Sequence, residues 1–151
     1  MSCMGKAIKI AGAGLGGLSA AVLLADEKDV EVYEAKGTVG FPSGDDVQAV
    51  RNYGMSKDQF DFFEEQGLTF DFFHPIKKII KYAPSGKSMA VKSENGPLFY
   101  AFKRGPNNRS LEQQLYTQAV GKGVHFTFNT RKNLSSVDIV STGAIYRNVW
   151  A

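Results

Sequence analysis

The stretch Lys6–Gly40, KAIKIAGAGLGGLSAAVLLADEKDVEVYEAKGTVG, decides the fold of this chain. A short apolar run, Ala7–Ala11, is interrupted only by Lys9 and leads directly into the glycines of Gly12–Gly17. The run is too short for a helix and is typical of a strand, so the spacing G-x-G-x-x-G falls where a strand turns into a helix. The stretch therefore predicts a strand, a glycine turn and a helix.

Each spaced glycine of the turn has a role that a side chain would prevent. Gly12 allows the tight turn, Gly14 lets a pyrophosphate approach bare backbone, and Gly17 allows close packing of helix on strand. Unpaired N–H groups and the positive end of the helix dipole favour an anion at this helix start. We expect a phosphate group here; the alternative is a glycine-rich turn with no ligand.

The next helix and strand continue the same unit. Apolar residues recur at helical spacing from Leu15 to Ala25, which predicts an amphipathic helix packed on a sheet. Val30–Tyr33 follows as a strand, and Glu34 ends it at the spacing where an acid reaches the ribose hydroxyls of an adenine dinucleotide. A carboxylate there would repel a 2′-phosphate, so Glu34 favours FAD or NAD over NADP.

Composition indicates an ordinary globular chain. Hydrophobic residues make up 43% of the 151 residues, and the formal net charge of +3 is too small to indicate nucleic-acid binding. Lys77, Lys78 and Lys81 are expected on the solvent face of a strand, with RNA binding as the less favoured alternative. The single cysteine, Cys3, excludes an internal disulfide and a metal-ligand pattern, which favours a cytoplasmic location. No apolar stretch is long enough for a transmembrane segment.

From the glycine turn to Gly40 the sequence resembles a known family. The order G-x-G-x-x-G-x-x-x-A, a strand ending in Glu34, then Lys36 and Gly40, resembles the N-terminus of FAD-dependent oxidoreductases of the glutathione-reductase type. Within them it is most similar to the geranylgeranyl reductase and aromatic hydroxylase group. Residues 41–44 lack the cysteine that prenyl reductases of this group commonly carry.

The resemblance implies an α/β fold, with a Rossmann-like FAD/NAD(P)-binding βαβ unit and an inserted antiparallel β-meander. It implies that Glu34 holds the adenosine ribose and that the spaced glycines accommodate the pyrophosphate. It also implies that Ala35, Lys36 and Gly40 line the adenosine and ribityl side.

Two short helices are predicted after this unit. The first covers Val47–Tyr53, with a cap at Ser43, and the second follows the capping box Ser56–Gln59 and ends at Gly67. Three strands over 76–82, 88–92 and 98–102, separated by turn residues, then predict an antiparallel meander.

Aromatic residues gather around the second helix, at Phe60, Phe62, Phe63, Phe70, Phe72 and Phe73. We expect them to pack in the core, and the alternative is a wall for an apolar substrate or a flavin ring. His74 has no partner visible in the sequence and is expected to be structural or exposed rather than an acid or base.

The last part of the chain resembles the return to the nucleotide domain in the same family. A basic loop, Lys103–Arg109, precedes a helix capped by Ser110, and short apolar strands follow at Val124–Phe128 and Val137–Val140. The resemblance implies that Arg104 contacts the flavin or its phosphates, and the alternative is a surface arginine.

These patterns divide the chain into two expected parts. The dinucleotide (FAD)-binding domain is expected over 1–54 and 104–151, and an inserted helix with antiparallel strands over 55–103 begins a substrate layer. The chain is expected to be incomplete relative to the family, because a second flavin contact, typically Gly-Asp, has no counterpart. The predicted cofactor-binding residues are Gly12, Gly14, Leu15, Gly16, Gly17, Glu34, Ala35, Lys36, Gly40 and Arg104. No residue is assigned to catalysis or to a metal.

The function expected from the resemblance is that of an FAD-dependent oxidoreductase acting on a small-molecule, apolar substrate such as a prenyl group. One alternative is an NAD-binding dehydrogenase domain. The other is a non-catalytic, truncated flavoprotein fragment that acts, if at all, through a protein partner.

Overall fold

The computed structural model describes residues 6–40 and 46–143. Its centre is a four-stranded sheet in the order β8-β2-β1-β9, and every neighbouring pair is parallel. Its strands are β1 (Ile8–Ala11), β2 (Val30–Tyr33), β8 (His125–Thr127) and β9 (Ile139–Val140), with the 3-10 turn η1 (Leu134–Ser136) before β9. Numbered along the chain, the parallel strands run 3-2-1-4, the order of a Rossmann-type half-sheet. The predicted α/β class is confirmed.

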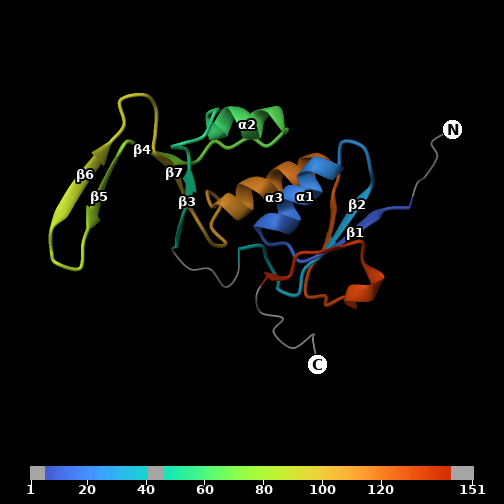
Figure 1. The fold of residues 1–151 in the computed structure, drawn as a ribbon. Helices are drawn as coiled ribbons and strands as arrows, with labels where there is room; N and C mark the ends of the chain where they lie inside the picture. Colours follow the sequence, from blue (N-terminus) through green and yellow to red (C-terminus); the bar gives the residue numbers. More distant parts are fainter. Residues whose placement is uncertain (1–5, 41–45, 144–151) are drawn as a thin grey trace.

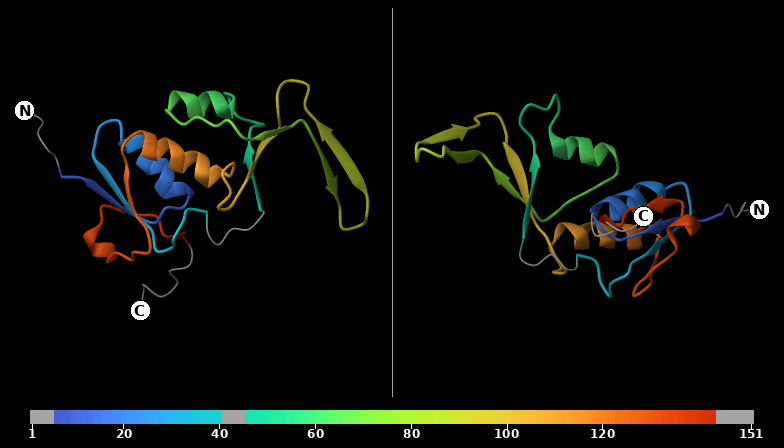
Figure 2. Two further views of the ribbon diagram at one scale, coloured as in Figure 1. Left: turned by 180° about the vertical axis from the view of Figure 1, so that it is seen from behind. Right: turned by 60° about the horizontal axis from the view of Figure 1, so that its bottom comes forward.

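Two helices cover one face of the parallel sheet. Helices α1 (Leu15–Leu24) and α3 (Leu111–Gly121) lie side by side (Figures 1 and 2). The core between helices and sheet contains Ile10, Leu18, Ala21, Val22, Val32, Leu115 and Ala119. Helix α1 packs on the sheet as predicted. It is not amphipathic, because Ser19 is its one polar residue, and it contacts α3 as well as the sheet.

The antiparallel strands form two separate sheets. Strands β3 (Val47–Arg51), β7 (Phe99–Lys103) and β4 (His74–Ile76) pair in that order, whereas β5 (Lys78–Tyr82) and β6 (Ser88–Lys92) form a hairpin that projects from the body (Figures 1 and 2). The predicted antiparallel strands are thus present, but β7 pairs with β3 and β4 rather than with β6. This pairing lets the apolar face of β7 pack on the second short helix, α2 (Gln59–Glu65).

The helix predicted over Val47–Tyr53 is wrong, because Val47–Arg51 is strand β3. Its two valines fit helical spacing, but β-branched side chains also suit a strand. Pairing with β7 along its whole length, from Val47 opposite Lys103 to Arg51 opposite Phe99, outweighs this weak local preference. The predicted turn and cap at residues 41–44, and Cys3, lie outside the described residues.

Helix α2 forms as predicted, but its N-cap is Asp58 rather than Ser56. The Asp58 carboxylate accepts the N–H of Phe60 at 2.8 Å. It also accepts the hydroxyl of Tyr100 at 2.8 Å and the side-chain amide of Asn52 at 2.9 Å, which together tie α2 to β7 and to the end of β3.

The phenylalanine cluster is divided: Phe60, Phe63 and Phe70 are partly buried and pack against the core, as expected, whereas its other three rings are exposed. The Phe60 ring lies 4.2 Å, centroid to centroid, from Tyr100 and 6.0 Å from Phe102, which is 1% exposed. Phe62, Phe72 and Phe73 are 45%, 44% and 39% exposed, so the expected core packing is wrong for these three. His74 and the lysines at 77, 78 and 81 are exposed, as predicted.

Helix α3 begins as the sequence predicts. The Ser110 hydroxyl accepts the N–H of Gln113 at 3.2 Å. Strands β8 and β9 then add to the two sides of the parallel sheet, β8 beside β2 and β9 beside β1.

Candidate functional site

A cavity of about 440 Å³ lies at the carboxyl ends of the four parallel strands. Residues that follow β1, β2, β8 and β9 all line it. In open α/β sheets, ligands bind outside the carboxyl ends of the strands, where the strand order reverses. That reversal falls between β1 and β9, so the cavity lies where ligands bind in sheets of this topology.

The three spaced glycines of the turn differ in what the fold requires of them. Gly12 has a φ of +99°, and a Cβ there would run into the carbonyl oxygen of Ser141. A Cβ on Gly17 would run into the carbonyl of Gly12, so this residue allows helix α1 to lie close to the turn. Gly14 has a φ of −77°, which any residue adopts, and a Cβ there would have Ser141 O at 4.0 Å as its nearest neighbour. At Gly14, therefore, the missing side chain leaves open space in the cavity.

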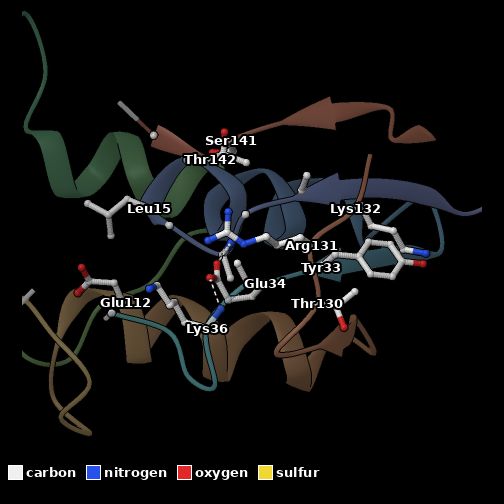
Figure 3. A pocket seen from close by; sticks show the side chains of 18 of the residues that line it. Leu15, Tyr33, Glu34, Lys36, Glu112, Thr130, Arg131, Lys132, Ser141 and Thr142 are labelled. Carbon is white, nitrogen blue, oxygen red and sulfur yellow. Dashed lines mark hydrogen bonds between the residues drawn. The ribbon is translucent and has the colours of Figure 1, made fainter. Parts of the chain in front are cut away.

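Glu34 is fixed against the glycine turn by two backbone donors. Its Oε2 accepts the N–H of Ala13 at 2.7 Å and its Oε1 accepts the N–H of Lys36 at 2.9 Å (Figure 3). A carboxylate offers about four acceptor positions. Each oxygen of Glu34 thus retains acceptor capacity for a ligand hydroxyl, and its position is set before a ligand arrives.

One end of the cavity is lined by residues that the sequence reasoning missed. Tyr33, Thr130 and Lys132 lie at this end, opposite Leu15 and Glu112 (Figure 3). Thr130 and Lys132 follow β8, so only the pairing of β8 with β2 brings them beside Glu34.

The Tyr33 ring at this end is fixed by its neighbours. The ammonium nitrogen of Lys132 lies 4.3 Å from the centre of the ring. The Tyr33 hydroxyl donates to Glu31 Oε2 at 2.5 Å, and this hydrogen bond, with burial, raises the pKa of Tyr33. The hydroxyl therefore stays protonated and acts as a donor at neutral pH.

The segment after β9 closes the glycine turn from the other side. The backbone N–H of Ser141 donates to the carbonyl of Ala11 at 2.8 Å, and the Ser141 hydroxyl oxygen lies 2.9 Å from the position of a Cβ on Gly16. Gly16 is thus confined by Ser141. The sequence placed a strand before Ser141 but did not place this residue in the site.

Arg104 lies at the end of the cavity away from Tyr33, in a network of side chains. Its Nε donates to Glu112 Oε1 at 2.5 Å, and its Nη1 donates to Gln48 Oε1 at 3.2 Å. Glu112 Oε2 accepts the N–H of Gly105 at 3.2 Å. Gly40, with a φ of +80°, packs against the carbonyl of Gly105, where a Cβ would clash. The chain that follows Glu34 therefore reaches the Arg104 loop.

The structure brings the predicted site residues together, with one exception. Gly17 does not line the cavity, because it lies beneath the turn. The predicted residues that do line it are Gly12, Gly14, Leu15, Gly16, Glu34, Ala35, Lys36, Gly40 and Arg104. The lining residues that sequence reasoning missed are Ala11, Ala13, Tyr33, Thr38, Glu112, Thr130, Arg131, Lys132, Leu134, Ser141, Thr142 and Gly143.

Residues 6–40 and 46–143 contain neither a cluster of metal ligands nor a membrane-spanning helix. No group of three or more His, Cys, Asp or Glu residues is placed to hold a metal ion in this part of the chain. None of its helices has the length and apolar character needed to cross a membrane.

Comparison with protein families gives the class of the nucleotide unit. Residues 10–57 match the family model described as an NAD(P)-binding Rossmann-like domain. The matched segment contains the glycine turn, helix α1, strand β2 and Glu34. Together with the parallel sheet, this match supports a Rossmann-like α/β fold for this part of the chain. A comparison with curated proteins gives no match.

Solved structures share the fold at low sequence identity. The tetrameric form of 2-methyl-3-hydroxypyridine-5-carboxylic acid oxygenase is 21% identical, with a TM-score of 0.61, over 83% of this chain and 32% of its own. A geranylgeranyl bacteriochlorophyll reductase-like protein from Thermoplasma acidophilum is 18% identical, with a TM-score of 0.61, over 84% and 32%. PqsL of P. aeruginosa, in complex with 2-aminobenzoylacetate, is 18% identical, with a TM-score of 0.59, over 83% and 34%. The chain spans about a third of the length of these proteins.

Proposed function

We propose that this chain is the FAD-binding N-terminal portion of an FAD-dependent oxidoreductase. The observation that carries the proposal is the position of Glu34, which directly follows β2 and is held by the N–H of Ala13 in the glycine turn. An acid in this position accepts hydrogen bonds from the ribose hydroxyls of an adenine dinucleotide.

The proposed roles follow from what each part of the cavity offers. Helix α1 begins at Leu15 with Gly14 as its N-cap, so the N–H groups of its first turn lack intrahelical acceptors. They would donate to the pyrophosphate, which passes over the open space at Gly14. Lys36, Gly40 and the Arg104 loop would line the part of the ligand beyond the ribose.

FAD is favoured by the extent of the cavity. It does not end at the glycine turn and Glu34 but continues to Gly40 and Arg104, beside the antiparallel strands. A plain NAD-dependent dehydrogenase needs neither this extension nor an antiparallel layer. A bound flavin would supply the hydride chemistry, and the protein would bind and orient it.

NAD is the second candidate, favoured by the description of the matching family model. The Glu34 carboxylate disfavours the 2′-phosphate of NADP in either case. Binding of NAD in preference to FAD would make the chain a nicotinamide-binding domain instead.

The substrate layer is also part of the proposal. The parallel sheet with α1 and α3 would bind the dinucleotide, and the antiparallel strands would begin the layer that covers a substrate. An apolar substrate such as a prenyl group is supported by the name of the Thermoplasma acidophilum neighbour. The phenylalanine cluster adds no support, because its rings pack mainly on one another and on β7.

A binding measurement tests this function. The purified chain is mixed with FAD, NAD or NADP, free ligand is removed by gel filtration, and the absorption spectrum of the protein fraction is recorded. We expect retention of the flavin spectrum, with NADP bound most weakly. Retention of NAD but not FAD would support the second candidate, and retention of no dinucleotide by a folded chain would contradict both.

A further inference from the structure

We propose that Glu112 positions Arg104 to bind the pyrophosphate of the dinucleotide, and that Gln48 connects this contact to the antiparallel sheet. The inference rests on the proposed function and adds a positioning residue to it. Glu112 makes no contact with the ligand in this scheme and acts only through Arg104.

Glu112 is a buried carboxylate whose partners are all at the Arg104 loop. Its side chain is 2% exposed, yet both oxygens are hydrogen bonded, Oε1 to Arg104 Nε and Oε2 to the N–H of Gly105. A buried carboxylate is costly unless it is paired and hydrogen bonded in this way. The buried Glu112 carboxylate therefore holds the Arg104 side chain through its Nε.

Arg104 keeps donors that its protein partners do not use. A guanidinium has five N–H donors in a rigid fork. Glu112 takes the one on Nε and Gln48 takes one on Nη1, while no residue within 6–40 or 46–143 accepts a hydrogen bond from Nη2. Arg104 lines the cavity, and a fixed guanidinium fork suits two oxygens of a phosphate. The remaining donors thus have the chemistry of an anion contact.

Gln48 and the backbone of Arg104 extend this contact to strand β3. Gln48 lies within β3, and the N–H of Arg104 donates to the carbonyl of Asp46 at 2.8 Å, immediately before the same strand. Arg104 itself directly follows strand β7. A ligand held by Arg104 would therefore steady the junction between the dinucleotide site and the antiparallel sheet.

A double-mutant cycle on the full chain tests the positioning role. The variants are Arg104→Met, Glu112→Gln and the double variant, and the measured quantity is the dissociation constant of FAD by titration. Loss of a charge-assisted contact predicts about a tenfold weaker affinity in Arg104→Met and a smaller loss in Glu112→Gln. The decisive expectation is that Glu112→Gln has no further effect once Arg104 is Met.

A purely structural role for Glu112 predicts a different result. The loss caused by Glu112→Gln would then be the same with Arg or Met at position 104, and such additivity would overturn the inference. Gln48→Ala serves as a second variant in the same cycle if Glu112→Gln does not fold, with the same expectation. Because the wild-type chain is titrated first, failure to bind any dinucleotide would refute the proposed function and this inference together, whereas binding with additive losses would refute this inference alone.

Discussion

The carboxylate of Glu34 accepts the backbone N–H of Ala13 at 2.7 Å, so the acid at the end of β2 is joined directly to the turn at the end of β1. The two residues lie just beyond the carboxyl ends of the adjacent parallel strands β1 and β2, and the bond links the segments that follow them. Glu34 therefore stabilises the turn in addition to its proposed contact with a ribose. Substitutions of Glu34 can change protein stability and dinucleotide affinity to different extents.

Glu34→Ala is expected to weaken FAD binding by about 1–3 kcal/mol, because charge-assisted hydrogen bonds to the ribose are lost. It also removes the acceptor of Ala13 and Lys36, so the melting temperature should fall. Glu34→Gln is the matched control, because it keeps one acceptor oxygen and the side-chain size. Calorimetric titration and thermal unfolding separate the two effects, and unchanged affinity in both variants would remove Glu34 from the site.

Gly14→Val should lose FAD binding but keep most of its stability, whereas Gly17→Ala should lose stability. The side chain at position 14 would enter the cavity, so FAD binding is lost while the free energy of unfolding falls by less than about 1 kcal/mol. A Cβ at position 17 meets the Gly12 carbonyl, and such overpacking costs about 1–3 kcal/mol or more. Denaturant unfolding and FAD titration check both. Normal FAD binding by Gly14→Val would contradict the proposed path of the pyrophosphate.

Tyr100 should make the fold sensitive to alkaline pH. Burial and the hydrogen bond to Asp58 raise the pKa of Tyr100 from 10.0 to about 12. Because the folded state favours the protonated hydroxyl, this stabilisation is complete below pH 10 and is lost as pH rises toward about 12. Unfolding followed against pH should show this decline in the wild type. Tyr100→Phe should lack it, and an identical alkaline decline in both would contradict the assignment.

Asp58 should make the same region sensitive to acid. Burial acts to raise its pKa, but hydrogen bonds from Phe60 N, Tyr100 and Asn52 outweigh it, so the pKa of Asp58 lies below its usual value of 3.8. The folded state favours the carboxylate, so its stabilisation is present above that value and is lost as pH falls through the lowered pKa. At neutral pH, Asp58→Ala should destabilise the protein by about 0.5–2 kcal/mol through loss of the helix cap. The loss should shrink at acid pH, and a loss independent of pH would contradict the assignment.

Phe102 and Phe62 give a matched pair for the aromatic core. Phe102→Ala empties a buried site and should lower the free energy of unfolding by about 3–5 kcal/mol. Phe62→Ala, at an exposed position, should change it by about 0.5 kcal/mol or less. Denaturant unfolding measures both, and equal losses would mean that the cluster is not arranged as described.

The nucleotide unit could be predicted from the sequence because its determinants are local. Gly12, Gly17 and Glu34 stand at spacings that follow from one strand, one turn and one helix. Strand β3 could not, because its state depends on pairing with β7, far along the chain. A valine at positions 47 and 50 suits either periodicity, and only the partner strand decides between them.

The same reason explains the missed part of the site. Lys132 and Ser141 reach the cavity because β8 adds beside β2 and β9 beside β1. Neither of these strand pairings can be predicted from the local sequence pattern. In the sequence, Glu112 is only an acidic residue in the first turn of the helix capped by Ser110, and its burial beside Arg104 becomes apparent only when helix α3 is placed.

The contact between Gly12 and Ser141 has a consequence for the order of events during synthesis. The turn precedes β2, β8 and β9 along the chain, whereas the serine that closes it follows β9, the last of these four strands. A nascent chain that has not yet produced β9 lacks one wall of the cavity. The cavity is therefore complete only after the segment that follows β9 has joined the sheet, and the proposed dinucleotide would bind after that step rather than before it.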